Sequence, residues 1–355
     1  MSHVKTIFIT GGCGFIGSHF ARLCLQQGYK IINLDALTYA ASQNTLKDIE
    51  NNHINYHFVK GNIQNRELVK SLFSKFKPSA VVNLAAETHV DRSIDSPSSF
   101  IDTNILGAFT LLDESRSYYT NLSSEEKDQF RFLHVSTDEV YGSCPGNPYK
   151  EDAPYNPSSP YSSSKASADL IIRSYYYTYN FPILITNCTN NYGPYQFPEK
   201  LIPHIVIRAF HNQTLPIYGD GMQVRDWLYV EDHVDAILKV LQLGKVGETY
   251  NIAGLNGEVH NKTVVEEICH ILDTLAPRKD NLSYKDLITY VTDRPGHDFR
   301  YALGIDKIKN EMGWAPTVNF RDGLKKTIDW YIENSQWWQD ILEKGYQADR
   351  IGLRK

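Results

Sequence analysis

The chain has 355 residues, of which 42% are hydrophobic and 22% charged, and its formal net charge is -5 at pH 7. This length can bury a sizeable core and is long for one simple domain, so we expect one large unit or two lobes that share a cleft. The negative balance excludes the general basic field of a nucleic-acid binder, and we predict no nucleic-acid partner. An anionic ligand must therefore be met by a few placed cationic side chains.

Five cysteines are scattered along the chain, at positions 13, 24, 144, 188 and 269. Their odd number argues against a disulfide framework and their spacing against a metal site, so we predict no bound metal and a reduced, cytoplasmic setting. The N-terminal stretch lacks the layout of a signal peptide, and no apolar segment approaches membrane-spanning length. We therefore expect no membrane association.

Short apolar runs alternate with longer amphipathic stretches along the first half of the chain. We expect strands at 4–10, 30–35, 55–59, 80–84, 132–136 and 183–187, and helices at 18–27 and 67–76. Strands separated by helices in this way pair in parallel through right-handed crossovers. The predicted fold class is α/β, a Rossmann-type doubly wound parallel sheet with a smaller C-terminal substrate-binding lobe.

The first predicted strand ends in the glycine-rich turn TGGCGFIGS. Gly12, Gly14 and Gly17 satisfy G-x-G-x-x-G, and Gly11 also produces the G-x-x-G-x-x-G variant. Glycines at these positions allow a tight turn and a close approach of the backbone to a pyrophosphate, which sits at the start of the following helix. Because the motif follows an apolar strand and opens a helix, we interpret it as a dinucleotide-binding turn.

The next predicted strand ends at Asp35. In a dinucleotide-binding fold this is the position of an acid that bonds the adenosine ribose. A carboxylate would repel a 2′-phosphate, and no arginine follows Asp35 directly, so the sequence favours NAD over NADP.

Two adjacent acids, Asp138 and Glu139, follow the apolar strand that ends in HVST. Adjacent residues of a regular strand point to opposite faces, so a continued strand would drive one acid toward the core. We therefore expect the strand to stop before them, at the carboxyl edge of the sheet where ligands of open α/β sheets bind.

Tyr161 and Lys165 lie four residues apart in PYSSSK, at the start of a predicted helix. This spacing places them on one helical face, so the ammonium can lower the pKa of the phenol. A phenolate held by a lysine suits removal of a proton from an alcohol or sugar hydroxyl while a hydride leaves for a nicotinamide.

From about Tyr192 the alternation of apolar and amphipathic stretches gives way to Pro- and Gly-rich segments, which we interpret as the smaller lobe.

These motifs together resemble those of the extended short-chain dehydrogenases/reductases and, among them, the dTDP-glucose 4,6-dehydratase family. The resemblance covers nearly the whole chain and includes TGGCGFIGS, LDALTYA, NLAAETHVDRSI, STDEVYG, PYSSSKAS, TNCTNNYGPYQFPEKLIP, PIYGDG, VRDWLYVEDH, GETYNI and DRPGHDFRYA. Its most discriminating piece is the run 137–139, Thr-Asp-Glu, where related epimerases carry small or hydroxyl residues. The resemblance implies residues 1–191 as mainly the NAD-binding domain and 192–355 as mainly the nucleotide-sugar lobe, interleaved with late elements of the first.

The resemblance also implies a reaction. Oxidation of C4 of dTDP-glucose acidifies the C5 proton, water is eliminated across C5 and C6, and the hydride held on bound NAD returns to C6. By resemblance Tyr161 is the base for C4 oxidation with Lys165 tuning it, and Thr137 holds the C4 oxygen. Glu139 takes the C5 proton and Asp138 protonates the departing C6 hydroxyl. For Asp138 to donate, burial beside another carboxylate must raise its pKa.

Further contacts follow from the same resemblance. The implied cofactor-binding residues are Gly11, Gly14, Phe15, Ile16, Gly17, Asp35, Ala36, Leu37, Thr38, Asn62, Ile63, Leu84, Ala85, Ala86, Thr103, Tyr161, Lys165 and Asn191. The implied substrate-binding residues are Thr88, Thr137, Asn190, Lys200, Leu201, Pro216, Ile217, Tyr218, Arg225, Asn261, Asp293, Arg294 and His297. Arg225 and Arg294 suit a diphosphate, and exposed ion pairs are the alternative for each.

The chain departs from the family pattern at four places. Asn62 replaces a usual aspartate, so the adenine would meet an amide, and Ala36 replaces a usual lysine. One extra residue precedes Asn261, which leaves Asn256 as its rival, and the loop 143–159 is shorter than in some relatives.

The remaining motifs receive structural interpretations. His89, Asp91 and Arg92 are assigned no catalytic role, and the tryptophans 314, 330, 337 and 338 are interpreted as packing or C-terminal surface. Helices expected at 98–119 and 161–179 resemble those of the superfamily's dimer contact, so a homodimer is inferred by analogy.

Three alternatives remain open. The same chemistry on UDP-glucose is the nearest, since thymine and uracil differ by one methyl, which is discriminated by only about 1 to 3 kcal/mol. A C4 epimerase or decarboxylase of the same fold is disfavoured by Asp138 and Glu139. A non-catalytic, NAD-responsive regulator would have lost members of the predicted catalytic set, and none is lost.

Overall fold

The largest element of the fold is a parallel sheet of seven strands, in the order β10-β6-β5-β4-β1-β2-β3. The structure is a computed structural model and describes residues 5–255 and 258–343. The strands are β1 (Thr6–Thr10), β2 (Lys30–Asp35), β3 (Tyr56–Lys60), β4 (Ala80–Asn83), β5 (Arg131–Thr137), β6 (Ile183–Cys188) and β10 (Thr249–Ile252). Every neighbouring pair is parallel, which confirms the predicted Rossmann-type doubly wound sheet.

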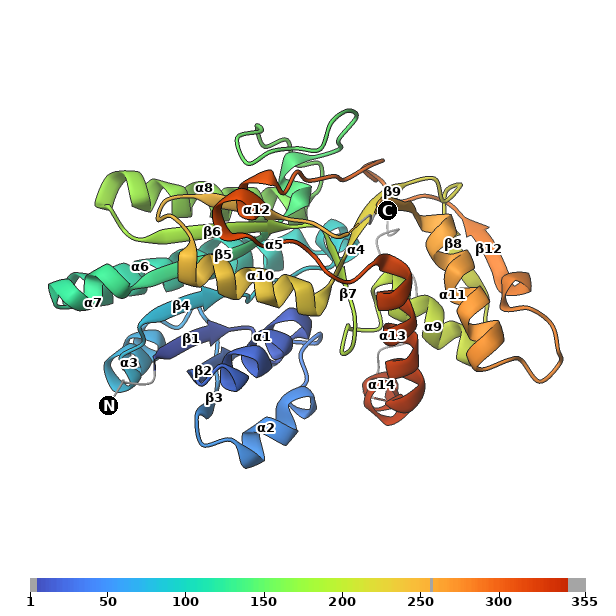
Figure 1. The fold of residues 1–355 in the computed structure, drawn as a ribbon, viewed down its shortest axis with the longest axis horizontal. Coiled ribbons are helices and arrows are strands. Elements are labelled where there is room, and N and C mark those ends of the chain that lie inside the picture. The colour runs from blue at the N-terminus through green and yellow to red at the C-terminus, as the bar shows by residue number, and fades with distance from the viewer. Residues whose placement is uncertain (1–4, 256–257, 344–355) are drawn as a thin grey trace.

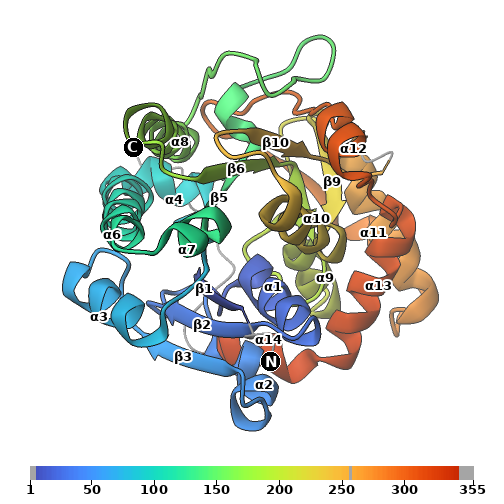
Figure 2. The same ribbon diagram turned by 60° about the vertical axis from the view of Figure 1, so that its left-hand side comes forward.

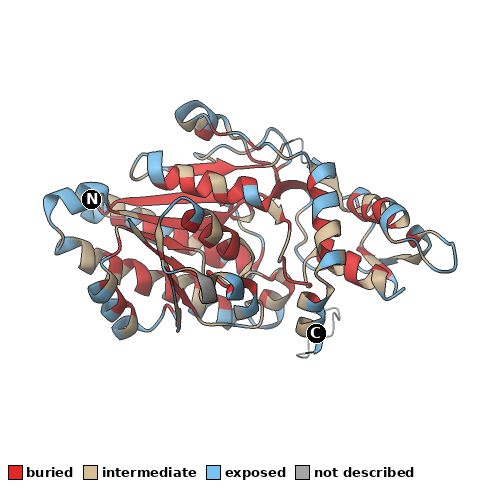
Figure 3. Cartoon of the chain, turned by 60° about the horizontal axis from the view of Figure 1, so that its bottom comes forward, coloured by how far each residue is buried: buried red, intermediate tan, exposed pale blue. Residues whose placement is uncertain are grey.

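The central strands are apolar on both faces because helices cover both faces of the sheet. One layer contains α1 (Phe15–Gln26), α10 (Val230–Leu243) and α12 (Asp306–Met312), and the other contains α3 (Arg66–Phe76), α6 (Ala108–Thr120) and α8 (Pro160–Tyr179) (Figure 2). Figure 3 shows buried residues filling the strands and the inward faces of these helices. Two apolar cores therefore hold the sheet rigid from either side.

A nearly continuous helical run leads from β4 toward α6. It consists of α4 (Val90–Asp95), α5 (Pro97–Phe100) and a π-helical stretch, Ile101–Gly107, before α6 begins. The predicted helix at 98–119 is present, with the π-helical stretch as a feature that its sequence pattern did not indicate. Asn104 within this stretch accepts from the N–H of Glu87 at 2.9 Å and donates to its carbonyl at 3.0 Å. The π-helical stretch thereby holds the segment that follows β4.

The C-terminal lobe has its own core and lies at one end of the sheet (Figure 1). Its strands form two small sheets, β11-β9-β7 and β12-β8. The elements are β7 (Asn190–Tyr192), β8 (Leu215–Tyr218), β9 (Val224–Tyr229), β11 (Glu258–His260), β12 (Ile288–Val291), α9 (Leu201–Phe210), α11 (Asn261–Leu275), α13 (Phe320–Glu333) and α14 (Ser335–Glu343). Because β10 and α10 belong to the first core, the chain crosses between the two parts more than once. The division at residue 191 stays a prediction, and the ends of both predicted domains lie outside the described residues.

Shorter elements complete the chain. They are α2 (Lys47–Asn52), α7 (Ser124–Gln129) and the 3-10 turns Gln43–Leu46, Asp138–Tyr141 and Tyr284–Leu287. Trp314 and Trp338 are buried, and Trp330 and Trp337 pack partly buried beside the second core, as a packing role requires. None of the helices within 5–255 and 258–343 combines the length and the apolar character needed to cross a bilayer.

A buried carboxylate on α10 ties the first part of the fold to the segment that leads into α13. Asp232 accepts from the backbone N–H groups of Thr317 and Val318 at 3.0 and 2.9 Å, and from the Thr317 hydroxyl at 2.7 Å. Three bonds to one carboxylate fix the entry of α13 against α10.

Replacing Asp232 by Ala should lower the free energy of unfolding by about 2 kcal/mol, because two backbone donors lose a charged acceptor. Asp232→Asn keeps one acceptor oxygen and should lose less than half of that amount. Urea unfolding followed by fluorescence measures both. An unchanged urea midpoint in Asp232→Ala would show that this carboxylate does not stabilise the junction.

Candidate active site

The glycine turn after β1 brings the start of α1 against the strand. Gly11 adopts a φ of 71° and its N–H donates to the carbonyl of Leu34 at 3.1 Å. A Cβ on Gly17 would lie 2.2 Å from the carbonyl oxygen of Gly11, so only glycine allows this approach. Gly14 is the N-cap and supplies no side-chain acceptor to the first turn of the helix. The free N–H groups and the helix dipole together suit a phosphate.

Asp35 lies buried at the end of β2 and organises the loop that follows. Its Oδ2 accepts from the N–H of Cys13 at 2.8 Å, and its Oδ1 accepts from the N–H of Leu37 at 2.7 Å. Burial raises the pKa of Asp35, and both N–H bonds act in the opposite direction. Leu37 adopts a φ of 52°, and its side chain packs on the core of the first layer. Leu37 does not line the cavity described below, and its predicted cofactor contact stays a prediction.

Asn62 follows β3 and forms a local turn, in which its Oδ1 accepts from the N–H of Gln64 at 2.8 Å. The part of its side chain that remains for a ligand is thus the amide N–H₂, a donor, where an aspartate would supply only acceptors. The departure from the family pattern at this position changes the hydrogen-bonding character of the cavity wall.

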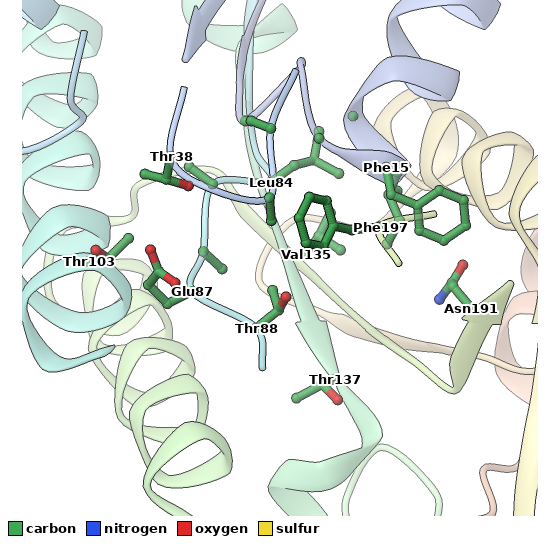
Figure 4. A pocket seen from close by; sticks show the side chains of 18 of the residues that line it. Phe15, Thr38, Leu84, Glu87, Thr88, Thr103, Val135, Thr137, Asn191 and Phe197 are labelled. Atoms are coloured by element: carbon green, nitrogen blue, oxygen red, sulfur yellow. The ribbon is translucent and has the colours of Figure 1, made fainter. Parts of the chain in front are cut away.

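One cavity joins these segments to the acid pair and to α8 (Figure 4). Apart from Leu37, every predicted cofactor residue lines it. Thr88, Thr137, Asp138, Glu139, Asn190 and Lys200 line it as well. Figure 4 shows Thr137 at the end of β5, with Glu87 and Thr88 across from it and Asn191 on the side of the C-terminal lobe. The predicted cofactor and catalytic groups therefore share a single space.

The strand β5 ends at Thr137, and the two acids lie in the 3-10 turn Asp138–Tyr141. Thr137 is the N-cap of that turn, and its hydroxyl accepts from the N–H of Glu139 at 3.3 Å and donates to Asp138 Oδ1 at 3.2 Å. The strand stops before the acids, as predicted, because the threonine hydroxyl turns the backbone out of the sheet.

Burial raises the pKa of Asp138 well above its ordinary value, and the neighbouring charge of Glu139 raises it further. Its Oδ2 is buried and has no hydrogen-bond partner among the described residues. Burial also raises the pKa of Glu139, but Arg294, Arg225 and Lys200 act against that increase. The environments thus favour a protonated Asp138 beside a more acidic Glu139, which is the division that an acid and a base require.

Helix α8 presents Tyr161 and Lys165 to the cavity. Pro160 occupies its first turn, and Ser159 caps it in a reciprocal arrangement with Ser162. Tyr161 and Thr137 both line the cavity. The ammonium of Lys165 donates to the carbonyl of Val135 at 2.8 Å, so it is held by β5 and not by the phenol.

The pKa of Tyr161 is raised well above 10, first by burial and then by Glu139, with the side chain of Thr137 acting in the opposite direction. The expectation that Lys165 lowers this pKa is not met in the present arrangement, because the ammonium faces the backbone of β5. Lowering it requires a positive charge closer to the phenol.

Apart from Asn190 and Lys200, the predicted substrate residues of the C-terminal lobe lie beyond the lining of this cavity. They are Leu201, Pro216, Ile217, Tyr218, Arg225, Asn261, Asp293, Arg294 and His297. Arg225 is buried, donates to the carbonyls of Val224 and Asp298 at 2.8 and 2.9 Å, and stacks on the Tyr301 ring at 4.3 Å. Its burial excludes the alternative of an exposed ion pair.

Arg294 joins the two parts of the molecule. Its guanidinium lies 3.2 Å from Asp91 Oδ1 on α4, and the Tyr218 hydroxyl donates to Asp91 Oδ2 at 3.5 Å. Asp91 thus positions an arginine whose charge reaches Glu139. Asp293 accepts from the N–H of Arg294 at 2.8 Å and contacts His297 Nδ1 at 2.7 Å, which fixes the same loop.

Asn261 opens α11, and its Oδ1 is buried with no hydrogen-bond partner among the described residues. A buried amide oxygen of this kind is available to a ligand. Its rival Asn256 lies outside the described residues.

The loop 143–159 packs against residues 300–304. The N–H of Cys144 donates to the carbonyl of Arg300 at 2.8 Å, and the N–H of Tyr149 donates to the carbonyl of Ala302 at 2.9 Å.

Several site residues were missed by sequence reasoning. Glu87 and Glu199 line the cavity, and each directly precedes a predicted residue, Thr88 or Lys200. Their position next to a predicted site residue was the sequence feature that could have identified them. Lys200 donates to the carbonyl of Thr88 at 2.8 Å, and Glu199 accepts from the Tyr39 hydroxyl at 3.0 Å.

Among the side chains in 5–255 and 258–343, no group of three or more His, Cys, Asp or Glu is arranged to hold a metal ion.

Comparison with known proteins agrees with this arrangement. The model of the GDP-mannose 4,6 dehydratase family matches residues 8–327. A dTDP-glucose 4,6-dehydratase of Xanthomonas campestris pv. campestris is 50% identical over 350 residues, which cover 98% of this chain and 99% of the relative. The crystal structure of dTDP-glucose 4,6-dehydratase from Bacillus anthracis in complex with NAD has a TM-score of 0.84 at 47% identity, over 95% of this chain and 100% of that one.

A second solved structure is similar to the same extent. DesIV, a dTDP-glucose 4,6-dehydratase from Streptomyces venezuelae with NAD and dTDP (TYD) bound, has a TM-score of 0.85 at 41% identity, over 95% of this chain and 100% of that one. The resemblance inferred from the motifs is thereby confirmed along almost the full length of both chains. The chain belongs to the GDP-mannose 4,6 dehydratase family, together with relatives that are dTDP-glucose 4,6-dehydratases.

Proposed function

We propose that this protein is a hydro-lyase that converts dTDP-glucose to dTDP-4-keto-6-deoxy-glucose with bound NAD. The observation that carries the proposal is the adjacent pair of the buried Asp138 and the partly buried Glu139, which shares one cavity with Tyr161, Lys165 and the glycine turn. An oxidation site alone would need only the tyrosine and the cofactor. Two further carboxyls with different environments supply the acid and the base of an elimination.

The residues present fit NAD. The uncapped start of α1 suits the pyrophosphate, and a Cβ on Gly11 would lie 2.8 Å from the N–H nitrogen of Ala85, so the turn is shaped for close backbone approach. Asp35 retains lone pairs for a ribose hydroxyl, and its negative charge opposes a 2′-phosphate. When bound, NAD would accept the hydride from C4 of the sugar and return it to C6.

Tyr161 and Thr137 act at C4. Tyr161 takes the proton of the C4 hydroxyl, and the Thr137 hydroxyl, which lines the same cavity, holds the C4 oxygen. Lys165 lies one helical turn further along α8 and supplies positive charge at the base of the cavity. These three groups come from β5 and α8, which pack together below the carboxyl edge.

Asp138 and Glu139 act at C6 and C5. A protonated Asp138 donates to the departing C6 hydroxyl, and its unpartnered Oδ2 is the atom available for that donation. Glu139 removes the C5 proton and later returns it, and the charges of Arg294, Arg225 and Lys200 favour its ionised form. No net oxidation results, and one water leaves.

The nucleotide end is assigned to the C-terminal lobe. Arg225 and Arg294 supply the cationic groups that a diphosphate needs in a protein of net negative charge, and Asn261 offers an unpartnered amide oxygen. The names of the relatives support dTDP over UDP.

We also propose a homodimer in the cytoplasm. Large apolar side chains are exposed on the helical run before α6, at Ile101 and Leu106, and on α8, at Leu170, Tyr177 and Tyr179. Exposed apolar side chains on two neighbouring helices suit a contact with a second copy.

The function is tested by incubating the purified protein with dTDP-glucose and, separately, with UDP-glucose in D₂O. We expect loss of water, deuterium at C5 and faster turnover of the dTDP sugar, measured by mass spectrometry and proton NMR. Faster turnover of UDP-glucose would reassign the nucleotide. If neither sugar loses water after NAD is supplied, the dehydratase assignment is wrong and an epimerase, decarboxylase or regulator must be considered.

Replacing Glu139 by Gln removes the C5 base without changing its size. The rate of dehydration should fall by about 10² to 10⁴, while the amount of NAD that remains with the protein stays the same. The measurement combines steady-state turnover with extraction and quantification of bound NAD. Near-normal turnover in Glu139→Gln would remove this residue from the mechanism.

Replacing Asp138 by Asn should separate oxidation from elimination, because an amide cannot protonate the leaving hydroxyl. We expect reduced nicotinamide to accumulate, seen by its near-ultraviolet absorbance, while water loss falls by about 10². In the unmodified protein the acid form is required, so elimination should decline as pH rises through the raised pKa of Asp138. Loss of both steps together in Asp138→Asn would assign Asp138 to binding instead.

A further inference from the structure

A cluster of buried polar side chains lies beneath Lys165 and has no role in the reaction described above. His134 belongs to β5, and Asp169 follows Lys165 by one turn of α8. Their side chains are 1% and 0% exposed. Burying a carboxylate is unfavourable unless it is paired and hydrogen-bonded, so the cluster calls for a functional explanation.

The ring of His134 lies between the lysine and the carboxylate. Lys165 Nζ is 3.1 Å from His134 Nε2, and the same ring nitrogen is 3.6 Å from Asp169 Oδ1. Because Lys165 and Asp169 are four residues apart, one helical face carries both of them. The ammonium, the ring and the carboxylate therefore form one contiguous group between β5 and α8.

The tautomer of His134 follows from its contact with Lys165. Burial and the charge of Lys165 lower the pKa of His134 well below its ordinary value, so the ring is neutral. Because an ammonium can only donate, His134 Nε2 accepts from Lys165 at 3.1 Å, and the single ring proton lies on Nδ1. Nδ1 faces the side-chain amide of Asn83 at 3.0 Å, on the side away from the lysine.

Asp169 is held as an anion by two hydroxyl donors. Its Oδ2 accepts from the Ser136 hydroxyl at 2.7 Å and from the Tyr155 hydroxyl at 3.1 Å, and Arg173 donates to that same tyrosine oxygen at 3.1 Å. Burial raises the pKa of Asp169 to about 6, which leaves it ionised at neutral pH.

The lysine itself needs a counter-charge. Burial lowers the pKa of Lys165 to about 8, and the charge of Asp169 acts against that decrease. The titratable groups around Lys165 are His134 on β5, Cys188 at the end of β6, and Tyr161 and Asp169 on α8. Of these, only Asp169 is an anion at neutral pH, since burial raises the pKa of Cys188 to about 12 and that of Tyr161 well above 10.

We propose that Asp169, with neutral His134 as the spacer, keeps Lys165 in its ammonium form, and that loss of this charge sets the alkaline limit of the reaction. Both are positioning residues, since neither lines the cavity that holds the reacting groups. The first half of the proposal concerns the charge of Lys165 and is independent of the substrate. The second half rests on the proposed function.

The charge of Lys165 is measured by NMR titration of protein that carries ¹³C at the lysine ε carbons, with the Lys165 signal identified by its absence from Lys165→Arg. We expect a midpoint at about 8. In Asp169→Asn, which preserves volume, the midpoint should fall by about one pH unit or more. Asp113→Asn, which removes a half-exposed carboxylate on α6 that pairs with Arg66, is the matched control and should leave it unchanged.

An unchanged midpoint in folded Asp169→Asn would overturn the proposal. If thermal melting shows that Asp169→Asn does not fold, Ser136→Ala replaces it. That variant removes one donor to Asp169 and should move the midpoint in the same direction by a smaller amount. No movement in Ser136→Ala would then overturn the proposal.

Kinetics test the second half. In Asp169→Asn the alkaline limb of the kcat profile for dTDP-glucose should move to lower pH by the same amount as the NMR midpoint, with KM unchanged. A shifted midpoint with an unshifted limb would separate the charge of Lys165 from catalysis. The NMR result stands without any substrate, so a failure of the dehydratase assignment is distinguishable from a failure of this proposal.

Discussion

Parallel pairing of the strands is the constraint from which the site follows. Because all seven strands of the large sheet run in one direction, the segments that leave β1, β2, β4, β5 and β6 emerge at the same edge. The strands themselves are buried on both faces and have little room for reactive groups. The glycine turn, Asp35, the acid pair and Asn190 therefore occupy the positions just past the strand ends, and they meet there although they are far apart in the sequence.

The two parts of the molecule affect the pKa values of the acid pair in different ways. The sheet and its helices remove water from Asp138, which makes ionisation costly. The C-terminal lobe supplies Arg225 and Arg294, which act on Glu139. The difference between two adjacent carboxyls thus arises from how the lobes meet, and Asp91 on α4 holds one of those arginines in place.

Local patterns made much of this predictable from the sequence. The strand ends, the glycine turn and the i, i+4 pair on α8 depend on periodicity and on short motifs, and they appear where they were expected. The left-handed backbone of Leu37 was not predicted, because a leucine rarely adopts that conformation. The direction of the Lys165 ammonium was also missed, because it depends on a carbonyl of β5 that is thirty residues away. Contacts of this kind exist only once the fold has formed.

Helix α8 has a mechanical consequence. Tyr161, Lys165 and Asp169 recur every fourth residue along it, and the cap at Ser159 with Pro160 anchors its first turn. A thermal displacement of this helix carries all three side chains together and preserves the spacing among them. The spacing that remains free to vary is the one between α8 and β5, which is spanned by the contacts of Lys165 with Val135 and His134. The packing of α8 against β5 thus determines how Tyr161 is aligned with Asp138 and Glu139.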